Sequence, residues 1–372
     1  MPYEYITKLA KNLYKIHIIM YNVDYMFKRN QTKLIRNKSL SFGGTEDVLI
    51  QSMCTFKTSN INEIIKQINL CAKHGANLMR VSILDKEDAN AIKVIKSKIK
   101  IPLVADIHYD YNLALLAMDS GVDKIRINPG NLNNKNEIIK IIEKAKEKDV
   151  IIRIGVNLGS IETNTNEEET HLLVEKALEY IKFFEENSFY KIIVSLKSSD
   201  PIITKQANEL FASLSNYPLH IGVTESGYDE IGIIRSVAGL SPLLINGIGN
   251  TIRISLTKNP LKEIETCKRL LHDLNLYKNY PTIISCPTCG RCKVQNTKEI
   301  AKKVFNFCIK NKKYIKVAIM GCIVNGIGEG KNADIGIAGA NGKFIIFKKG
   351  QQIKVVDQEN VLDEFYKIIL EF

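Results

Sequence analysis

Four arginines lie within short, strongly apolar segments of this chain, where charged side chains are unusual. They are the central residues of the triplets MRV, IRI, IRI and IRI, at Arg80, Arg126, Arg153 and Arg253. Burying a charge without a partner costs on the order of several kcal/mol. The internal partners that the sequence offers are Asp106, Asp200 and Glu225. Guanidinium groups match phosphate oxygens in geometry. The excess of arginines therefore favours a di- or polyanionic ligand over internal ion pairing alone.

A cysteine cluster near the C-terminal end is the second set of residues with chemical potential. The segment Cys286-Pro287-Thr288-Cys289 is followed by Cys322, in a glycine-rich turn that ends at Glu329. A single CxxC fits redox chemistry, zinc or neither. A structural zinc site is usually closed by a second tight pair, and none follows. Three soft ligands and one weaker position fit an iron–sulfur cluster. Because Cys292 forms a second, overlapping CxxC, spacing alone leaves the fourth ligand open.

Five further residues have less specific surroundings. Most buried free cysteines act as small hydrophobic residues, and this interpretation applies to Cys54, Cys71, Cys267 and Cys308. His108 ends an apolar run, where a catalytic role and a structural hydrogen bond fit equally well.

The scaffold for these residues is predicted from eight Val- and Ile-rich runs that alternate with amphipathic segments between Asp47 and Leu256. Runs without strict alternation are typical of strands buried on both faces. Eight such strands with intervening helices fit a (β/α)8 barrel, whose active sites lie at the C-terminal strand ends. A doubly wound sheet is less favoured because its glycine-rich first turn is missing. We predict strands at 48–53, 76–83, 101–107, 122–128, 150–157, 191–197, 217–224 and 251–256.

Composition narrows the class of protein. With 45% apolar and 25% charged residues the chain is globular. No run approaches the ~20 apolar residues of a membrane helix. Eight cysteines are too few for a disulfide scaffold and no signal-peptide pattern is present, so we expect reduced thiols and a cytoplasmic location. The net charge of +12 is spread along the chain without a basic run, which does not favour nucleic-acid binding.

Several longer segments together resemble one family, 4-hydroxy-3-methylbut-2-enyl diphosphate synthase, the iron–sulfur enzyme of the non-mevalonate isoprenoid pathway. The similarity runs from about Arg29 to the C-terminus and is of the bacterial two-domain type. The matching segments are 104–110 (VADIHYD), 124–131 (KIRINPGN), 153–157 (RIGVN), 224–227 (TESG), 285–289 (SCPTC) and 320–326 (MGCIVNG).

The resemblance implies a TIM-like barrel over residues 29–280, a small α/β ferredoxin-like cluster domain over 281–372, and an extension of unknown role over 1–28. It implies a 4Fe-4S cluster held by Cys286, Cys289 and Cys322, with Glu329 in preference to Cys292 as the fourth ligand. It further implies a homodimer in which the cluster domain of one subunit caps the barrel of the other, and flavodoxin or ferredoxin as electron donor.

The implied reaction is the reductive ring opening and dehydration of 2-C-methyl-D-erythritol 2,4-cyclodiphosphate to (E)-4-hydroxy-3-methylbut-2-enyl diphosphate, so the chain would be an oxidoreductase. Glu225 is the implied proton donor, with Asp106 and His108 nearby. The implied substrate-binding residues are Arg80, Arg126, Asn128, Arg153, Asn157, Lys197, Arg253 and Ser255.

Two rival functions fit parts of the sequence. A Schiff-base lyase would use Lys197 at the end of the sixth predicted strand, beside an incidental zinc site. A zinc-ribbon RNA-binding protein would bind RNA in a salt-sensitive manner. Residues 286–314, however, lack the interleaved aromatic and basic residues that stack on bases.

Overall fold

The computed structural model describes residues 31–131, 134–156, 165–257, 259–323, 328 and 330–372. The chain separates into two compact units, with the division between Leu270 and Leu271. Each unit has its own sheet, and each is considered by itself below.

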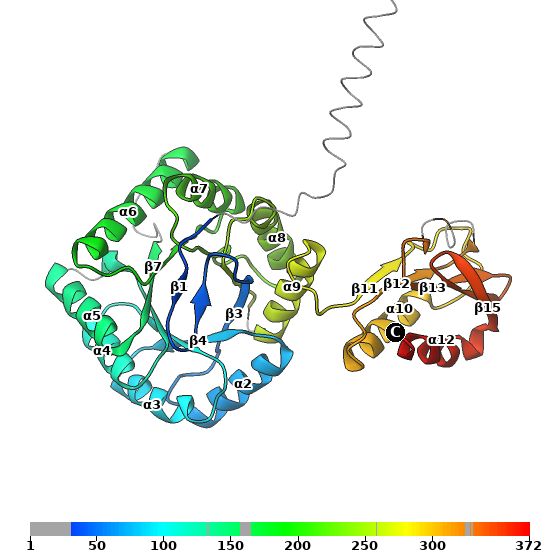
Figure 1. The fold of residues 1–372 in the computed structure, drawn as a ribbon, viewed down its shortest axis with the longest axis horizontal. Coiled ribbons are helices and arrows are strands. Elements are labelled where there is room, and N and C mark those ends of the chain that lie inside the picture. The colour runs from blue at the N-terminus through cyan, green and yellow to red at the C-terminus, as the bar shows by residue number, and fades with distance from the viewer. Residues whose placement is uncertain (1–30, 132–133, 157–164, 258, 324–327, 329) are drawn as a thin grey trace, which may run out of the picture. The chain divides into compact units, whose positions relative to one another are not determined.

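The first unit is a parallel barrel surrounded by helices, which Figure 1 shows from one end. The strand order is β8-β7-β6-β5-β4-β3-β10-β9. A parallel bridge between Val194 of β8 and Leu219, just before β9, joins the two ends of this order. The strands are β3 (Leu49–Met53), β4 (Leu78–Ile83), β5 (Leu103–Ile107), β6 (Lys124–Ile127), β7 (Ile151–Val156), β8 (Ile192–Leu196), β9 (His220–Ile221) and β10 (Thr251–Ile252). The predicted (β/α)8 barrel is therefore confirmed.

The barrel helices follow the strands in alternation and carry one buried face each. They are α2 (Ile61–His74), α3 (Lys86–Lys96), α4 (Tyr111–Asp119), α5 (Lys135–Lys148), α6 (Asn166–Glu186), α7 (Pro201–Leu214), α8 (Asp229–Ile245) and α9 (Pro260–Asp273). In α2 the buried residues Ile64, Ile68 and Cys71 recur at helical spacing. In contrast, β5, β6, β7 and β8 are buried at every position, as expected of strands between a filled interior and a helical layer.

Local sequence signals fix the ends of individual helices. Gly75 ends α2 with a φ of 108°, a left-handed conformation that favours glycine. At the start of α7, the Asp200 carboxylate accepts the amide hydrogens of Ile202 (2.6 Å) and Ile203 (3.3 Å). Asp200 was one of the candidate partners for a strand arginine. Its carboxylate instead caps a helix, and within the described residues it has no arginine partner.

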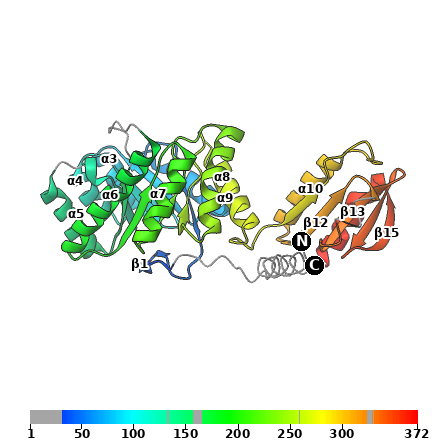
Figure 2. The same cartoon turned by 90° about the horizontal axis from the view of Figure 1, so that it is seen from above.

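A short antiparallel hairpin covers the N-terminal ends of the barrel strands. It consists of β1 (Ile35–Arg36) and β2 (Ser41–Phe42), and Figure 2 shows β1 at one end of the barrel. The Asn37 side-chain amide donates to the carbonyl oxygens of Asp123 and Asp149, which precede β6 and β7. Phe42 is fully buried, and Lys124 Nζ lies 4.6 Å from its ring centre. This end of the barrel is therefore filled, which leaves the opposite end for a ligand.

The second unit is a five-stranded mixed sheet covered by two helices. The strands are β11 (Thr282–Ser285), β12 (Lys316–Met320), β13 (Ile335–Ala340), β14 (Lys343–Lys348) and β15 (Gln351–Asp357), paired in chain order. The first three run parallel and the last two pairs are antiparallel. Helices α10 (Thr297–Lys310) and α12 (Val361–Leu370) share one apolar core with the sheet. Phe307 and Tyr366 stack between them with ring centres 4.0 Å apart. The predicted small α/β unit is confirmed.

Candidate active site

The strand arginines lie in the barrel interior, and two of them share one carboxylate. Arg80 of β4 lies with Nε 3.5 Å from Asp106 Oδ2, and Arg126 of β6 with Nη1 3.2 Å from Asp106 Oδ1. The backbone positions of Asp106, Arg126 and Arg153 are register partners on adjacent strands, which places the three side chains on the same face. His108 Nε2 lies 3.7 Å from the same carboxylate. Four of the predicted site residues are therefore brought together around Asp106.

The electrostatic balance keeps the Asp106 carboxylate ionised. Burial alone would raise the pKa of Asp106, but the charges of Arg80, Arg126 and Arg153 outweigh that effect, and the pKa lies below its ordinary value. Burial lowers the pKa of Arg80 to about 10, because removal of water disfavours the charged form. At neutral pH this part of the site is a carboxylate clamped between two charged guanidinium groups.

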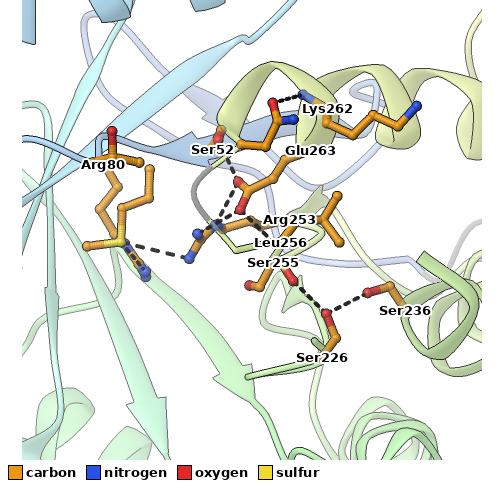
Figure 3. A network of polar contacts seen from close by, with 12 residues as sticks. Ser52, Arg80, Ser226, Ser236, Arg253, Ser255, Leu256, Lys262 and Glu263 are labelled. Carbon is orange, nitrogen blue, oxygen red and sulfur yellow. Dashed lines mark hydrogen bonds and ion pairs between the residues drawn. The ribbon is translucent and has the colours of Figure 1, made fainter. Parts of the chain in front are cut away.

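Arg253 of β10 pairs with a carboxylate that sequence reasoning missed. Glu263, in the first turn of α9, accepts hydrogen bonds from Arg253 Nη2 (3.0 Å) and Nε (3.2 Å). Figure 3 shows this pair together with Ser52 and Leu256, which also contact the Glu263 carboxylate. A usable signal existed, because Glu263 lies at helical spacing from the buried Cys267 and Leu270 and so falls on the apolar face of its helix.

Arg153 of β7 is a buried cation that has no ion pair with a carboxylate within the described residues. It is 2% exposed, and its Nε and Nη1 atoms have no hydrogen-bond partner within the described residues. Burial lowers its pKa well below the ordinary value, and the charges of Arg80 and Arg126 lower it further. A buried donor without an acceptor costs free energy. The chemistry of these two nitrogens calls for an anionic acceptor that the described protein atoms do not provide.

Lys197, just beyond β8, adds a second cation without a carboxylate in the described part of the chain. Loss of hydration lowers its pKa well below the ordinary value, and the charge of Arg153 contributes next. Gly222 provides the space for its amine, since a Cβ there would lie 2.7 Å from Lys197 Nζ. Gly155 does the same for Arg126, whose Nε would lie 2.7 Å from a Cβ at that position. These two glycines therefore make room for cations at the C-terminal ends of the strands.

The remaining predicted residues around the barrel are less closely engaged. Asn128 makes local contacts, accepting the Gly130 amide hydrogen (3.2 Å) and donating to Asn131 Oδ1 (3.2 Å). The Ser255 carbonyl accepts from Ser226 Oγ at 2.6 Å, a contact visible in Figure 3. Glu225 is exposed and has a φ of 48°. Asn157 lies outside the described residues.

One unpredicted residue lies between two of the arginines. The Met53 sulfur accepts hydrogen bonds from Arg80 Nη2 (2.8 Å) and Nε (3.2 Å), and it lies 3.8 Å from Arg253 Nη1. Met53, Arg253 and Glu263 also line a pocket of about 270 Å³. The Met53 sulfur therefore lies between the guanidinium groups of Arg80 and Arg253. Because a thioether is a weak acceptor, a stronger acceptor could take its place.

In the second unit, two predicted ligands emerge at the same edge of the sheet. β11 and β12 run parallel with Ser285 opposite Ile319, so Cys286 and Cys322 follow neighbouring strand ends. The Gly321 amide donates to Cys286 Sγ at 3.0 Å. A Cβ at Gly321 would lie 2.5 Å from Cys292 Sγ and 3.4 Å from Cys286 Sγ. A side chain at position 321 would therefore collide with the sulfur of Cys292. The Gly321 amide points at the sulfur of Cys286.

The other predicted ligands are not gathered with these two. Cys289 is exposed, and hydrogen bonds from the backbone and then the side chain of Arg291 lower the pKa of its thiol. Glu329 lies outside the described residues. Across the described ranges, no group of three or more His, Cys, Asp or Glu side chains is placed to bind a metal ion. The other four cysteines, at positions 54, 71, 267 and 308, are buried, which confirms their interpretation as small hydrophobic residues.

None of the helices in the described segments is long and apolar enough to span a membrane.

Comparison with known proteins gives matches over nearly the whole chain. Residues 32–268 match the family model described as the GcpE TIM-barrel domain, and residues 282–371 match that of the GcpE protein C-terminal domain. A protein of Bacillus velezensis is 45% identical over 92% of this chain and 92% of its own length. Similar values hold for proteins of Fusobacterium nucleatum (45%; 91% and 97%) and Bacillus subtilis (44%; 92% and 91%). All three are named 4-hydroxy-3-methylbut-2-en-1-yl diphosphate synthase (flavodoxin).

The comparison with solved structures gives weaker matches. A dihydropteroate synthase from Yersinia pestis covers 65% of this chain and 98% of its own, with 11% identity and a TM-score of 0.48. The sequence matches are far stronger and confirm the family resemblance inferred from the motifs. The chain is therefore an enzyme that belongs to the GcpE family, the 4-hydroxy-3-methylbut-2-en-1-yl diphosphate synthases.

Proposed function

We propose that this enzyme binds 2-C-methyl-D-erythritol 2,4-cyclodiphosphate in the barrel and converts it, with two electrons and two protons, to (E)-4-hydroxy-3-methylbut-2-enyl diphosphate and water. The observation that carries this proposal is the buried Arg153, whose Nε and Nη1 lack an acceptor within the described residues. A diphosphate supplies acceptors of matching charge and geometry.

The proposed substrate site combines fixed and unpaired cations. Arg80 and Arg126 are oriented by Asp106, and Arg253 by Glu263. Arg153 and Lys197 have no ion pair with a carboxylate in the described part of the chain, and the substrate would provide it. The remaining members of the proposed site lie at strand ends around these cations: Asn128, Asn157 and Ser255.

For proton transfer we propose Glu225, with Asp106 and His108 as the other members of the catalytic set. Glu225 is the proposed proton donor to the departing hydroxyl group, and its exposure supports proton exchange with water. Asp106, whose low pKa keeps it ionised, orients Arg80 and Arg126 during the reaction. His108, next to Asp106, completes the proposed catalytic set.

Cys286 and Cys322 follow neighbouring strand ends at one edge of the second unit's sheet, which we call the cysteine edge. The chemistry of the donors at this edge fits an iron–sulfur cluster. Thiolates are the usual cluster ligands, and backbone amides that donate to sulfur stabilise the negative charge of such centres. Cys286, Cys289 and Cys322 would hold a 4Fe-4S cluster, with Glu329 as the fourth ligand. When bound, the cluster supplies the electrons for the reduction. We therefore assign substrate binding to residues 29–280 and cluster binding to residues 281–372.

Exposed apolar residues support a homodimer in which a partner's cluster domain covers the barrel opening. Phe56, Leu84, Tyr109 and Tyr228 are all exposed, and they follow the C-terminal ends of β3, β4, β5 and β9. Large exposed apolar groups that surround one opening are typical of a contact surface. A second copy of this chain would bring its cysteine edge to the substrate.

The electron donor is a flavodoxin or a ferredoxin, and the relatives' names specify flavodoxin. Residues 271–372 contain sixteen Lys and Arg but only nine Asp and Glu. A basic domain attracts acidic electron carriers at low ionic strength. Reduced thiols and such donors fit a cytoplasmic enzyme without a nucleic-acid partner.

Anaerobic purification of the full chain tests the proposal. We expect brown protein with about four irons per chain, as in a 4Fe-4S centre, and turnover of the cyclic diphosphate with reduced flavodoxin. Colourless, zinc-loaded protein would contradict it, and borohydride trapping of a substrate on Lys197 would support the lyase instead.

A further inference from the structure

The buried carboxylate of Glu263 accepts four hydrogen bonds from its surroundings within the described residues. Its side chain is 3% exposed. Oε2 accepts from Ser52 Oγ (2.6 Å) and Arg253 Nε (3.2 Å), and Oε1 accepts from Arg253 Nη2 (3.0 Å) and the Leu256 amide (3.0 Å). A carboxylate offers about four acceptor positions. All four are in use, so this side chain has one defined orientation (Figure 3).

The contact with Arg253 is a fork-to-fork pair that occupies one edge of the guanidinium group. Nε and Nη2 face the carboxylate, which leaves Nη1 on the opposite side, 3.8 Å from the weakly accepting Met53 sulfur. Two parallel charge-assisted hydrogen bonds fix the plane of the guanidinium group as well as its position. The Nη1 atom of Arg253 therefore faces the Met53 sulfur, which Arg80 Nη2 contacts as well.

The same carboxylate connects three elements, of which β3 is distant in sequence from the other two. Ser52 is in β3, Leu256 follows β10, and Glu263 is in α9. Ser52 and Leu256 donate from fixed positions, so they hold the carboxylate in place independently of Arg253. A residue that served only to neutralise Arg253 would not need these additional donors.

We propose that Glu263 is a positioning residue that holds Arg253 with its Nη1 edge directed at a phosphate group of the ligand. This inference rests on the proposed function, because it assumes that Arg253 binds the diphosphate. Glu263 itself does not contact the ligand. Its removal acts on anion binding through Arg253.

The test uses the full-length, cluster-loaded enzyme, with inorganic pyrophosphate as the probe in calorimetric titrations and with KM and kcat measured separately. Glu263→Gln keeps the size of the side chain but replaces one acceptor with a donor that faces Arg253. We expect about 10-fold weaker pyrophosphate binding and a similar rise in KM, with kcat changed less than about twofold. Glu265→Gln is the matched control on the same helix, because Glu265 pairs only with the surface residues Lys262 and Arg269 within the described residues, and it should leave both values unchanged.

A double-mutant cycle separates positioning from a general structural role. If Glu263 acts through Arg253, the variant with both Arg253→Ala and Glu263→Gln binds pyrophosphate as weakly as Arg253→Ala alone. Additive losses, or unchanged binding in Glu263→Gln together with a lower Tm, would overturn the inference. Should Glu263→Gln not fold, Glu263→Asp keeps the buried charge but withdraws the carboxylate, and unchanged pyrophosphate binding there would also overturn it. If Arg253→Ala itself binds pyrophosphate normally, the proposed anion site fails instead.

Discussion

The barrel opening and the cysteine edge of the second unit carry their functional groups in different ways. In the barrel, Arg80, Arg126 and Arg253 lie on strands and are oriented by the carboxylates of Asp106 and Glu263. At the cysteine edge, the proposed ligands lie in connecting segments, and within the described residues the backbone amides of Gly321 and Arg291 donate to the sulfur atoms of Cys286 and Cys289. The proposed anion site is therefore preorganised by the protein's own ion pairs, whereas the proposed metal site would depend on its cluster for assembly.

Removal of one of the proposed cysteine ligands should have the strongest consequence. Cys322→Ser should abolish cluster binding, because an alcohol is a poor ligand for iron in a sulfur-rich centre. Iron analysis and the visible absorption spectrum should show complete loss, with activity reduced at least about 100-fold. Cys292→Ser is the matched control, since Cys292 is not a proposed ligand. Loss of iron in that variant would contradict the assignment of Glu329 as the fourth ligand.

The next largest effect concerns the unpaired arginine. Arg153→Met should raise KM by roughly 10- to 100-fold, because it removes charge-assisted hydrogen bonds worth about 1.5–3 kcal/mol. Arg126→Ala should raise KM less, since Arg126 shares its charge with Asp106. Both variants should bind iron as the wild type does. A larger effect at Arg126 than at Arg153 would mean that the unpaired nitrogens of Arg153 face no ligand.

A glycine-to-alanine substitution can be tested in both regions, at Gly155 in the barrel and at Gly321 in the second unit. Gly155→Ala would place a Cβ 2.7 Å from Arg126 Nε, and Gly321→Ala would place one 2.5 Å from Cys292 Sγ. We expect the first to raise KM about 10-fold without loss of iron, and the second to reduce iron content without change in pyrophosphate affinity. Crossed effects, such as iron loss in Gly155→Ala, would show that the two sites are not independent. Gly290→Ala, with no atom within 4 Å of the new Cβ, serves as the neutral control.

The smallest expected effect is a pH dependence of anion binding. The pKa of Lys197 lies well below its ordinary value because of lost hydration and the neighbouring arginines. A bound anion favours the charged amine, so pyrophosphate affinity should be highest below this lowered pKa and should fall as the pH rises through it. Calorimetry at several pH values should show this fall in the wild type and a flatter profile in Lys197→Met. An identical profile in the two proteins would exclude Lys197 from the anion site.

Most of the barrel could be predicted from the sequence because its elements have strong local signals. In the helices at 61–74 and 135–148, the buried apolar residues recur at helical spacing. The last two strands are shorter than predicted, since only His220–Ile221 and Thr251–Ile252 pair with their neighbours. Apolar character continues beyond these residues, but the strand pairing does not, and only tertiary structure reveals that difference.

Elements with weak burial signals could not be predicted. β15 (Gln351–Asp357) is exposed at six of its seven positions, so no apolar alternation marks it. The β1–β2 hairpin is too short for periodicity. In the candidate site, the arginines were recognisable because charges interrupt apolar runs. The carboxylate partner of Arg253 was harder to recognise, because Glu263 reaches it from a helix, and the one signal is the position of Glu263 on the apolar face of α9.

In the proposed diphosphate site of the barrel, Nε and Nη1 of Arg153 have no acceptor within the described residues, and we propose that the ligand supplies it. Calorimetric titration of pyrophosphate into the full-length wild type and Arg153→Met tests it most directly. We expect saturable binding to the wild type and at least about 10-fold weaker binding to the variant. Equal affinity in the two proteins, or no binding to the wild type, would contradict it.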